Sequence, residues 1–131
     1  MQKFARLVFL LLPFGAFMPT SGFAAVQTDD FLVTTTAQLL NLCTAAQTDP
    51  MAVPALNFCH GFAVGVARVL QEEDAANPNA KAMFCLPPSG VDRNHALSEF
   101  VQWASADPSR MSLPATDGIA EFLAAYYPCS H

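Results

Sequence analysis

Four cysteines constrain this chain more than any other feature of its sequence. They are Cys43, Cys59, Cys85 and Cys129, and all of them follow an N-terminal segment with the character of an export signal. Exported chains fold in an oxidising environment, where an even number of cysteines indicates disulfide bonds. We therefore expect two disulfides. Four cysteines allow three pairings, and their spacing alone does not choose among them.

The segment 1–25 has the parts of a secretory signal peptide. It begins with two basic residues, continues with the apolar run Leu7–Phe17 and ends in small residues. The apolar run is shorter than a membrane span, which needs about 20 residues. We expect cleavage after Ala24 or Ala25. The mature protein would then be periplasmic and would have no membrane span.

Removal of this segment leaves one acidic domain over residues 26–131. The domain keeps Arg68, Lys81, Arg93 and Arg110 and all 11 acidic residues, so its net charge is 4 − 11 = −7. This balance argues against nucleic acid and anionic membranes as ligands, and it favours a basic protein partner. Because so small a domain is marginally stable by itself, cross-links would contribute much of its stability.

Apolar residues recur at helical spacing in four segments, and no segment shows the sustained alternation of a strand. We expect helices from about Asp30 to Ala46, from between Pro50 and Pro54 to about Asp74, from Asp92 to Asp107, and from Pro114 to Pro128. The run Val33–Thr36 is a weak helix former and could delay the start of the first helix. The sequence predicts an all-α fold, a small four-helix domain.

This order of helices selects one disulfide pairing. Consecutive helices with short connections pack antiparallel, so the first two and the last two would form two hairpins. Cys43, near the end of the first helix, then lies beside Cys59, near the start of the second. Cys85 precedes the third helix and Cys129 follows the fourth, so they also meet. We predict the bridges Cys43–Cys59 and Cys85–Cys129.

The sequence does not indicate catalysis, a metal or a cofactor. Cys59 and His60, with Cys85, Cys129 and His131, would form a zinc site only if the thiols stayed reduced, and paired Cys-x-x-Cys spacing is missing. A cysteine nucleophile needs a free thiolate, which the even cysteine count argues against. We therefore expect a protein that is not an enzyme, with no metal site.

Glycines and an aromatic residue within the helices indicate packing. Gly61 and Gly65 are four residues apart, and they would let a second helix approach closely. Gly118 weakens its helix relative to alanine, so it too suggests close packing. Trp103 is expected in the core, and the three histidines at the surface or at helix ends.

Four short motifs together resemble one protein family. They are Leu39–Cys43, Cys59–Gly65, Phe84–Pro87 and Tyr127–Cys129, and they span almost the whole mature chain. This combination is similar to the Rap/Tai family of type VI secretion immunity proteins. The resemblance implies a small helical periplasmic domain, often a homodimer. It also implies that the protein binds a peptidoglycan amidase delivered by a neighbouring cell and plugs the active-site cleft of that enzyme.

Two other roles remain open for the same scaffold. The first is a periplasmic binding or adaptor module of unrelated purpose. The second is an acid-stress chaperone resembling the small helical Hde proteins, in which the 11 carboxylates would supply a change of charge at low pH. The two expected disulfides would restrain the opening that a chaperone of this type needs.

The connection between the third and fourth helices is the candidate contact surface. Interfaces are enriched in Arg and Met, and Arg110 and Met111 lie here beside Asp107 and Ser109. The family resemblance also implies partner contacts around this hairpin. We predict that these four residues bind the protein partner. An ordinary solvated connection is the alternative.

Overall fold

The fold was analysed in a computed structural model of the protein, which describes residues 24–130. Most of the predicted signal peptide and His131 lie outside the described residues. The elements are a 3₁₀ helix η1 (Thr28–Leu32), helices α1 (Thr36–Cys43), α2 (Ala52–Ala76) and α3 (Arg93–Ser105), a 3₁₀ helix η2 (Pro108–Ser112) and helix α4 (Ala115–Tyr126). Within the described part the one β pairing is an isolated bridge between Thr35 and Pro114. The predicted all-α fold with four α-helices is confirmed.

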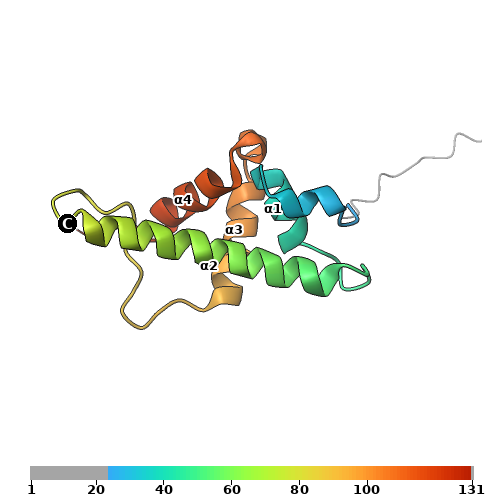
Figure 1. Ribbon diagram of the computed structural model, residues 1–131, viewed down its shortest axis with the longest axis horizontal. Coiled ribbons are helices and arrows are strands. Elements are labelled where there is room, and N and C mark those ends of the chain that lie inside the picture. Colours follow the sequence, from blue (N-terminus) through green and yellow to red (C-terminus); the bar gives the residue numbers. More distant parts are fainter. Residues whose placement is uncertain (1–23, 131) are drawn as a thin grey trace, which may run out of the picture.

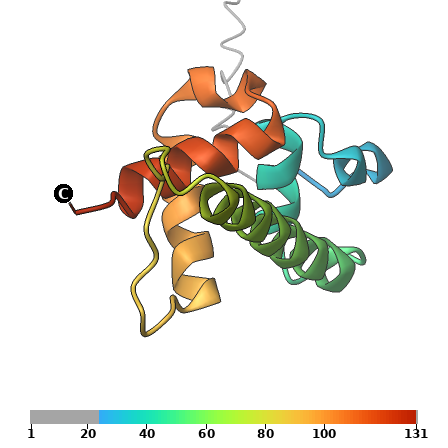
Figure 2. The ribbon, with the colours of Figure 1, turned by 60° about the vertical axis from the view of Figure 1, so that its left-hand side comes forward.

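Helices α1, α3 and α4 gather on one side of α2, which extends past them at both ends (Figure 1). The view rotated by 60° shows the same arrangement, with α2 seen nearly along its axis (Figure 2). The core therefore forms between three shorter helices and one face of a long helix. The largest fully buried side chains come from α1, α2 and α3, and they are Thr36, Leu39, Leu42, Cys59 and Phe100.

The first helix starts later than the sequence predicts. We expected a start at about Asp30, but Val33 adopts a left-handed conformation with φ of 48° and separates η1 from α1. Thr35 caps α1, because its hydroxyl accepts a hydrogen bond from the Gln38 amide at 3.3 Å. The Gln38 side chain in turn accepts from the Thr35 amide, which completes a capping box. A poor helix-forming run followed by this cap explains the break.

The other helix ends follow the expected signals. The Asp92 carboxylate accepts a hydrogen bond from the His95 amide at 2.8 Å and so caps α3. Pro114 directly precedes α4, where its fixed φ is compatible with the helix start. Tyr126, in the last turn of α4, is 42% exposed.

Both predicted disulfides are present. Cys43 at the end of α1 is bonded to Cys59 in α2, with their Cα atoms 5.3 Å apart. Cys85 is bonded to Cys129, with a Cα separation of 4.8 Å, and the Cys85 amide donates to the carbonyl of Tyr127. The first bridge fixes α1 on α2. The second ties the segment before α3 to the end of the chain.

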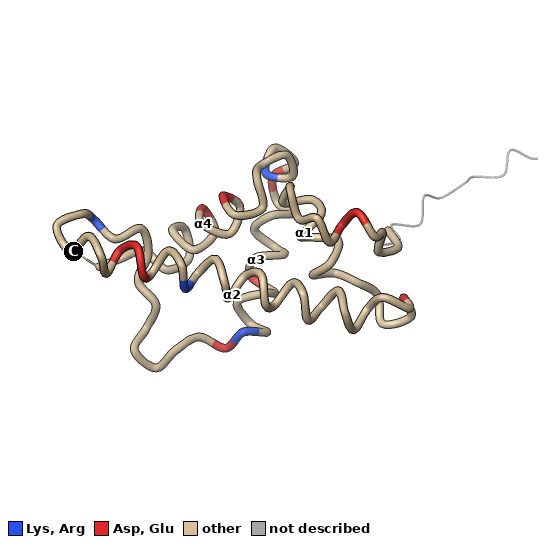
Figure 3. The backbone as a smooth tube through the Cα atoms, in the orientation of Figure 1, with Lys and Arg blue, Asp and Glu red and all other residues tan. Residues whose placement is uncertain are grey.

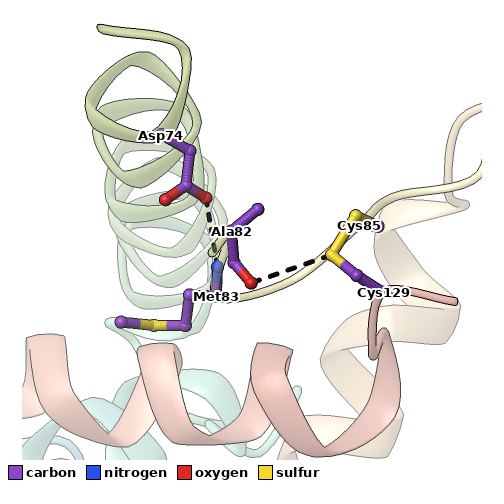
Figure 4. The surroundings of a disulfide bond; sticks show 5 residues. All are labelled: Asp74, Ala82, Met83, Cys85 and Cys129. Atoms are coloured by element: carbon purple, nitrogen blue, oxygen red, sulfur yellow. Dashed lines mark hydrogen bonds between the residues drawn. A yellow bond between two sulfur atoms is a disulfide. The ribbon is translucent and has the colours of Figure 1, made fainter. Parts of the chain in front are cut away.

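The segment before α3 is also attached to α2 (Figure 4). The Met83 amide donates to the Asp74 carboxylate at 3.3 Å, and Cys129 Sγ lies 3.8 Å from the carbonyl oxygen of Ala82. The second distance is a contact only, since an oxidised sulfur carries no proton to donate. The acidic end of α2 thus holds the chain that leads to the second disulfide.

Candidate partner-binding surfaces

The four predicted contact residues lie together at the end of α3 and in η2. The Asp107 carboxylate accepts hydrogen bonds from the Ser109 hydroxyl at 2.7 Å and from the Ser109 amide at 2.9 Å. These bonds lower the pKa of Asp107, and the charge of Arg110 adds to the effect. Asp107 therefore caps η2 as a carboxylate at neutral pH. Ser109 itself is exposed.

Arg110 is anchored in the fold. Its guanidinium lies over the Trp103 ring, 4.2 Å from the ring centroid, in a cation–π contact. One of its nitrogens also donates to the Trp103 carbonyl, and Nε lies 4.0 Å from Asp107 Oδ2. Met111 is half-buried and packs against the core. The hydroxyl of Ser112 is in an exposed position and donates to the Ser109 carbonyl. The exposed residues of this loop are Pro108, Ser109 and Ser112.

Sequence reasoning placed these residues in one loop but missed the structural role of Arg110. The expected core position of Trp103 is correct, since the residue is buried. The stack of Arg110 on Trp103 depends on the turn at Asp107, which brings the two residues together. Their spacing of seven residues in the sequence does not by itself indicate this contact. Replacement of Arg110 would therefore disturb the loop itself as well as any contact that the loop makes.

A second surface is the outer face of α2, which we define by Phe58, Gly61, Gly65 and Val69. These positions follow helical spacing and lie away from the core. Phe58 is 40% exposed and Val69 is 55% exposed. A Cβ added at either glycine would meet nothing within 4 Å. The expectation that Gly61 and Gly65 bring a second helix of this chain close is therefore wrong.

The outer face of α2 is also free of charge over much of its length (Figure 3). No Asp, Glu, Lys or Arg occurs between Met51 and Ala67. By length and composition α2 could cross a membrane, and 11% of its most apolar window is buried. The helix is nevertheless bonded to α1 through Cys59 and packs Ala52 and Ala55 in the core. An exposed apolar helix of this kind indicates an interaction surface.

A third surface is a groove of about 440 Å³ between α2, α3 and α4. Its floor consists of buried apolar side chains, which include Phe100, Ile119 and Phe122. Two exposed arginines, Arg68 and Arg93, line it from α2 and from the start of α3. The groove could not be predicted from the sequence, because its residues come from distant parts of the chain.

Tyr127 lines the groove and takes part in a small polar network. Its hydroxyl donates to Glu99 Oε2 at 3.0 Å, and Glu99 Oε1 lies 3.3 Å from His95 Nε2. Burial first, and then the bond and charge of Glu99, raise the pKa of Tyr127 to about 12. The phenol is therefore neutral at physiological pH. This network closes the end of α4 against α3.

The residues considered for zinc are held apart in other roles. Cys59, Cys85 and Cys129 are all oxidised, and His131 lies outside the described residues. Over residues 24–130, no group of three or more His, Cys, Asp or Glu side chains lies close enough to hold a metal ion. The oxidised sulfurs of these cysteines cannot act as thiolate nucleophiles.

A comparison with protein-family models finds one family for this chain. The family of Rap1a immunity proteins matches residues 35–129. No curated protein and no solved structure matches. The matched range contains all four helices, both disulfides and the loop 107–112.

Proposed function

Because this chain belongs to the Rap1a immunity protein family, we propose that it is a periplasmic immunity protein that inhibits a type VI secreted peptidoglycan amidase. The family match over residues 35–129 is the observation that carries the proposal. Two disulfides and the signal-like segment 1–25 support an exported location. Protection of a cell by this route requires binding alone, so no catalytic group is needed.

The proposed start of the mature chain is compatible with the contacts around Val26. The Val26 nitrogen donates to Asp49 Oδ2 at 2.8 Å, and the Val26 side chain is 9% exposed. If the signal peptidase cuts after Ala25, this nitrogen becomes the terminal ammonium group and forms an ion pair with Asp49. The intact mass of protein isolated from the periplasm tests the site, and it should correspond to a start at Ala25 or Val26.

The loop 107–112 is the proposed contact with the amidase. It projects at the edge of the molecule opposite the segment 86–92 (Figure 1). The exposed Ser109 and Ser112 and the partly exposed carboxylate of Asp107 can enter a cleft. The stack of Arg110 on Trp103 holds the loop rigid. A rigid projection loses little conformational entropy when it binds. The net charge of −7 would steer a basic toxin toward the protein.

A bulky substitution in the loop tests this contact without removing the Arg110 anchor. Ser112→Trp should weaken binding of a type VI secreted peptidoglycan amidase by at least about tenfold, because an obstructed interface loses its complementarity. Ser89→Trp is the matched control, since Ser89 is exposed and lies before α3 instead of after it. Calorimetric titration measures both. Equal affinity for the two variants would refute the loop assignment and leave the immunity role intact.

The outer face of α2 supports a homodimer as part of the proposed function. Two copies could bring their open glycines together and cover the apolar side chains beside them. Val69→Asp should then yield a monomer in light scattering, because a buried carboxylate without a partner is costly. Val53→Asp is the control, since Val53 is also exposed but lies on a different side of α2. A parent protein that is monomeric at high concentration would refute the dimer.

A further inference from the structure

The groove between α2, α3 and α4 combines an apolar floor with a basic rim. The floor contains Phe100, Ile119, Phe122 and Leu123, all of them buried side chains. The rim contains Arg68 and Arg93, with half-buried His60 beside them. Figure 3 shows basic charge on α2 and at the start of α3, the two elements that carry these arginines. One side of the groove thus offers apolar contact and another offers positive charge.

The positive charge of this rim is opposite in sign to the net charge of the protein. Residues 26–131 carry 11 acidic and four basic side chains, a balance of 4 − 11 = −7, and yet the described residues that line the groove include no carboxylate. Neither Arg68 nor Arg93 lies within ion-pair distance of a carboxylate in residues 24–130. Along the chain, the acidic residue nearest to Arg93 is Asp92, which caps α3, and the one nearest to Arg68 is Glu72, one turn later in α2, with which it forms no ion pair. Two guanidinium groups therefore remain available for an anionic ligand.

The floor itself offers no hydrogen-bonding group to a ligand; the free polar side chains among the lining residues, which are His60, Arg68, Gln71 and Arg93, come from α2 and the start of α3. Its aromatic and aliphatic side chains carry no polar atoms, and the hydroxyl of Tyr127 is already bonded to Glu99 at 3.0 Å. A sugar, a nucleotide or a polar peptide would leave its own polar groups unpaired here, which is costly. A volume of about 440 Å³ is in the range of small-molecule sites. The ligand that fits is a featureless apolar chain with one anionic end.

We propose that this groove binds a long-chain fatty carboxylate. The acyl chain lies over Phe100 and Ile119, and the carboxylate is held by Arg68 and Arg93, whose planar guanidinium groups suit carboxylate oxygens. No residue of the loop 107–112 lines the groove, so a protein with this ligand bound could still engage a toxin. The inference does not depend on the proposed immunity function.

Displacement of a fluorescent fatty acid tests the proposal on the mature, oxidised protein. Dansylaminoundecanoic acid should gain fluorescence on binding, and laurate should displace it with an affinity in the micromolar range. Dodecanol and dodecyltrimethylammonium have the same chain without the negative charge. They should compete at least about tenfold more weakly, because a charge-assisted hydrogen bond is lost. Equal competition by all three would overturn the assignment of the arginines.

Substitutions locate the site. Arg68→Ala with Arg93→Ala should weaken laurate binding by at least about tenfold, and Lys81→Ala, which removes a basic residue outside the groove lining, should leave it unchanged. Ala67→Trp should block the groove and abolish uptake of the probe, with the helical circular dichroism spectrum retained as evidence of folding. Absence of laurate binding to the parent would overturn the proposal. If Ala67→Trp then also prevented binding of the amidase, the groove would belong to the protein interface instead.

Discussion

Gly118 shows how one missing side chain decides the packing of two helices. A Cβ at this position would collide with Thr36 Oγ1 and lie 3.2 Å from Thr36 Cγ2. Thr36 cannot move away easily, since it is fully buried and its amide donates to the Leu113 carbonyl at 2.8 Å. The starts of α1 and α4 therefore meet at a point where only glycine fits. The sequence prediction of close packing at this glycine is confirmed.

Gly118→Ala should lower the free energy of unfolding by about 1–3 kcal/mol, the usual cost of overpacking. In a Thr36→Ala background the same change should cost less, because the colliding atoms are gone. Gly65→Ala is the matched control, and in the Val69→Asp background, which should be monomeric, it should raise the stability by up to about 1 kcal/mol through helix propensity. Urea denaturation of these variants measures these differences. An equal cost in both Thr36 backgrounds would contradict the packing account.

Tyr127 should lose its proton only at unusually high pH. Burial and Glu99 raise its pKa to about 12 from an ordinary value of 10.0. Because the neutral phenol is favoured in the folded state, its contribution to stability is complete below pH 10 and is lost as the pH rises toward about 12. A Tyr126→Phe variant leaves Tyr127 as the remaining tyrosine, so its near-ultraviolet absorbance gives the midpoint directly. A midpoint near 10 would contradict the described burial and hydrogen bond.

Individual residues were predictable from the sequence where a single local rule applied. Asp92 was expected to cap a helix, and it accepts the His95 amide. Trp103 was expected in the core, and it is buried there under Arg110. Gly61 and Gly65 could not be assigned correctly, because a pair of glycines permits a close approach without showing which helix, or which molecule, makes it.

At the scale of elements, the first disulfide joins α1 and α2, which already pack closely together, and the second joins the segment before α3 to the segment after α4. The bridge Cys85–Cys129 spans 44 residues and the bridge Cys43–Cys59 spans 16. Both pairings were predictable, since each follows from which helix ends are neighbours. The break at Val33 was harder to place, because it depends on the competition between a weak helix-forming run and the Thr35 cap.

Removal of either disulfide should lower the stability, and the loss should be greater for the disulfide that closes the longer loop. Replacing Cys85 and Cys129 by serine should lower the free energy of unfolding by about 4 kcal/mol, and the same change at Cys43 and Cys59 by about 3 kcal/mol, on a chain-entropy estimate. Urea denaturation of both variants and the parent in oxidising buffer decides this. A loss below about 1 kcal/mol for either pair would show that the bridge does not constrain the unfolded chain.

At the scale of the whole molecule, α2 leaves more apolar surface exposed than a solitary small domain needs. The three shorter helices cover one side of it, and its outer face and the groove remain open. The spacing of apolar residues predicted the helix but not which of its apolar faces is exposed. In a single sequence, the apolar residues of the outer face of α2 cannot be told apart from core residues. The identity of whatever covers a surface is information that one sequence does not contain.

The central claim is that this protein acts by inhibiting a peptidoglycan amidase, and inhibition measures it most directly. A secreted peptidoglycan amidase of the type VI class should be titrated with the mature, oxidised protein while peptidoglycan hydrolysis is followed. The account predicts a linear loss of hydrolysis that is complete at an equimolar ratio, as for a tight inhibitor that occupies the cleft. Full hydrolysis in the presence of an excess of folded protein would contradict the immunity function.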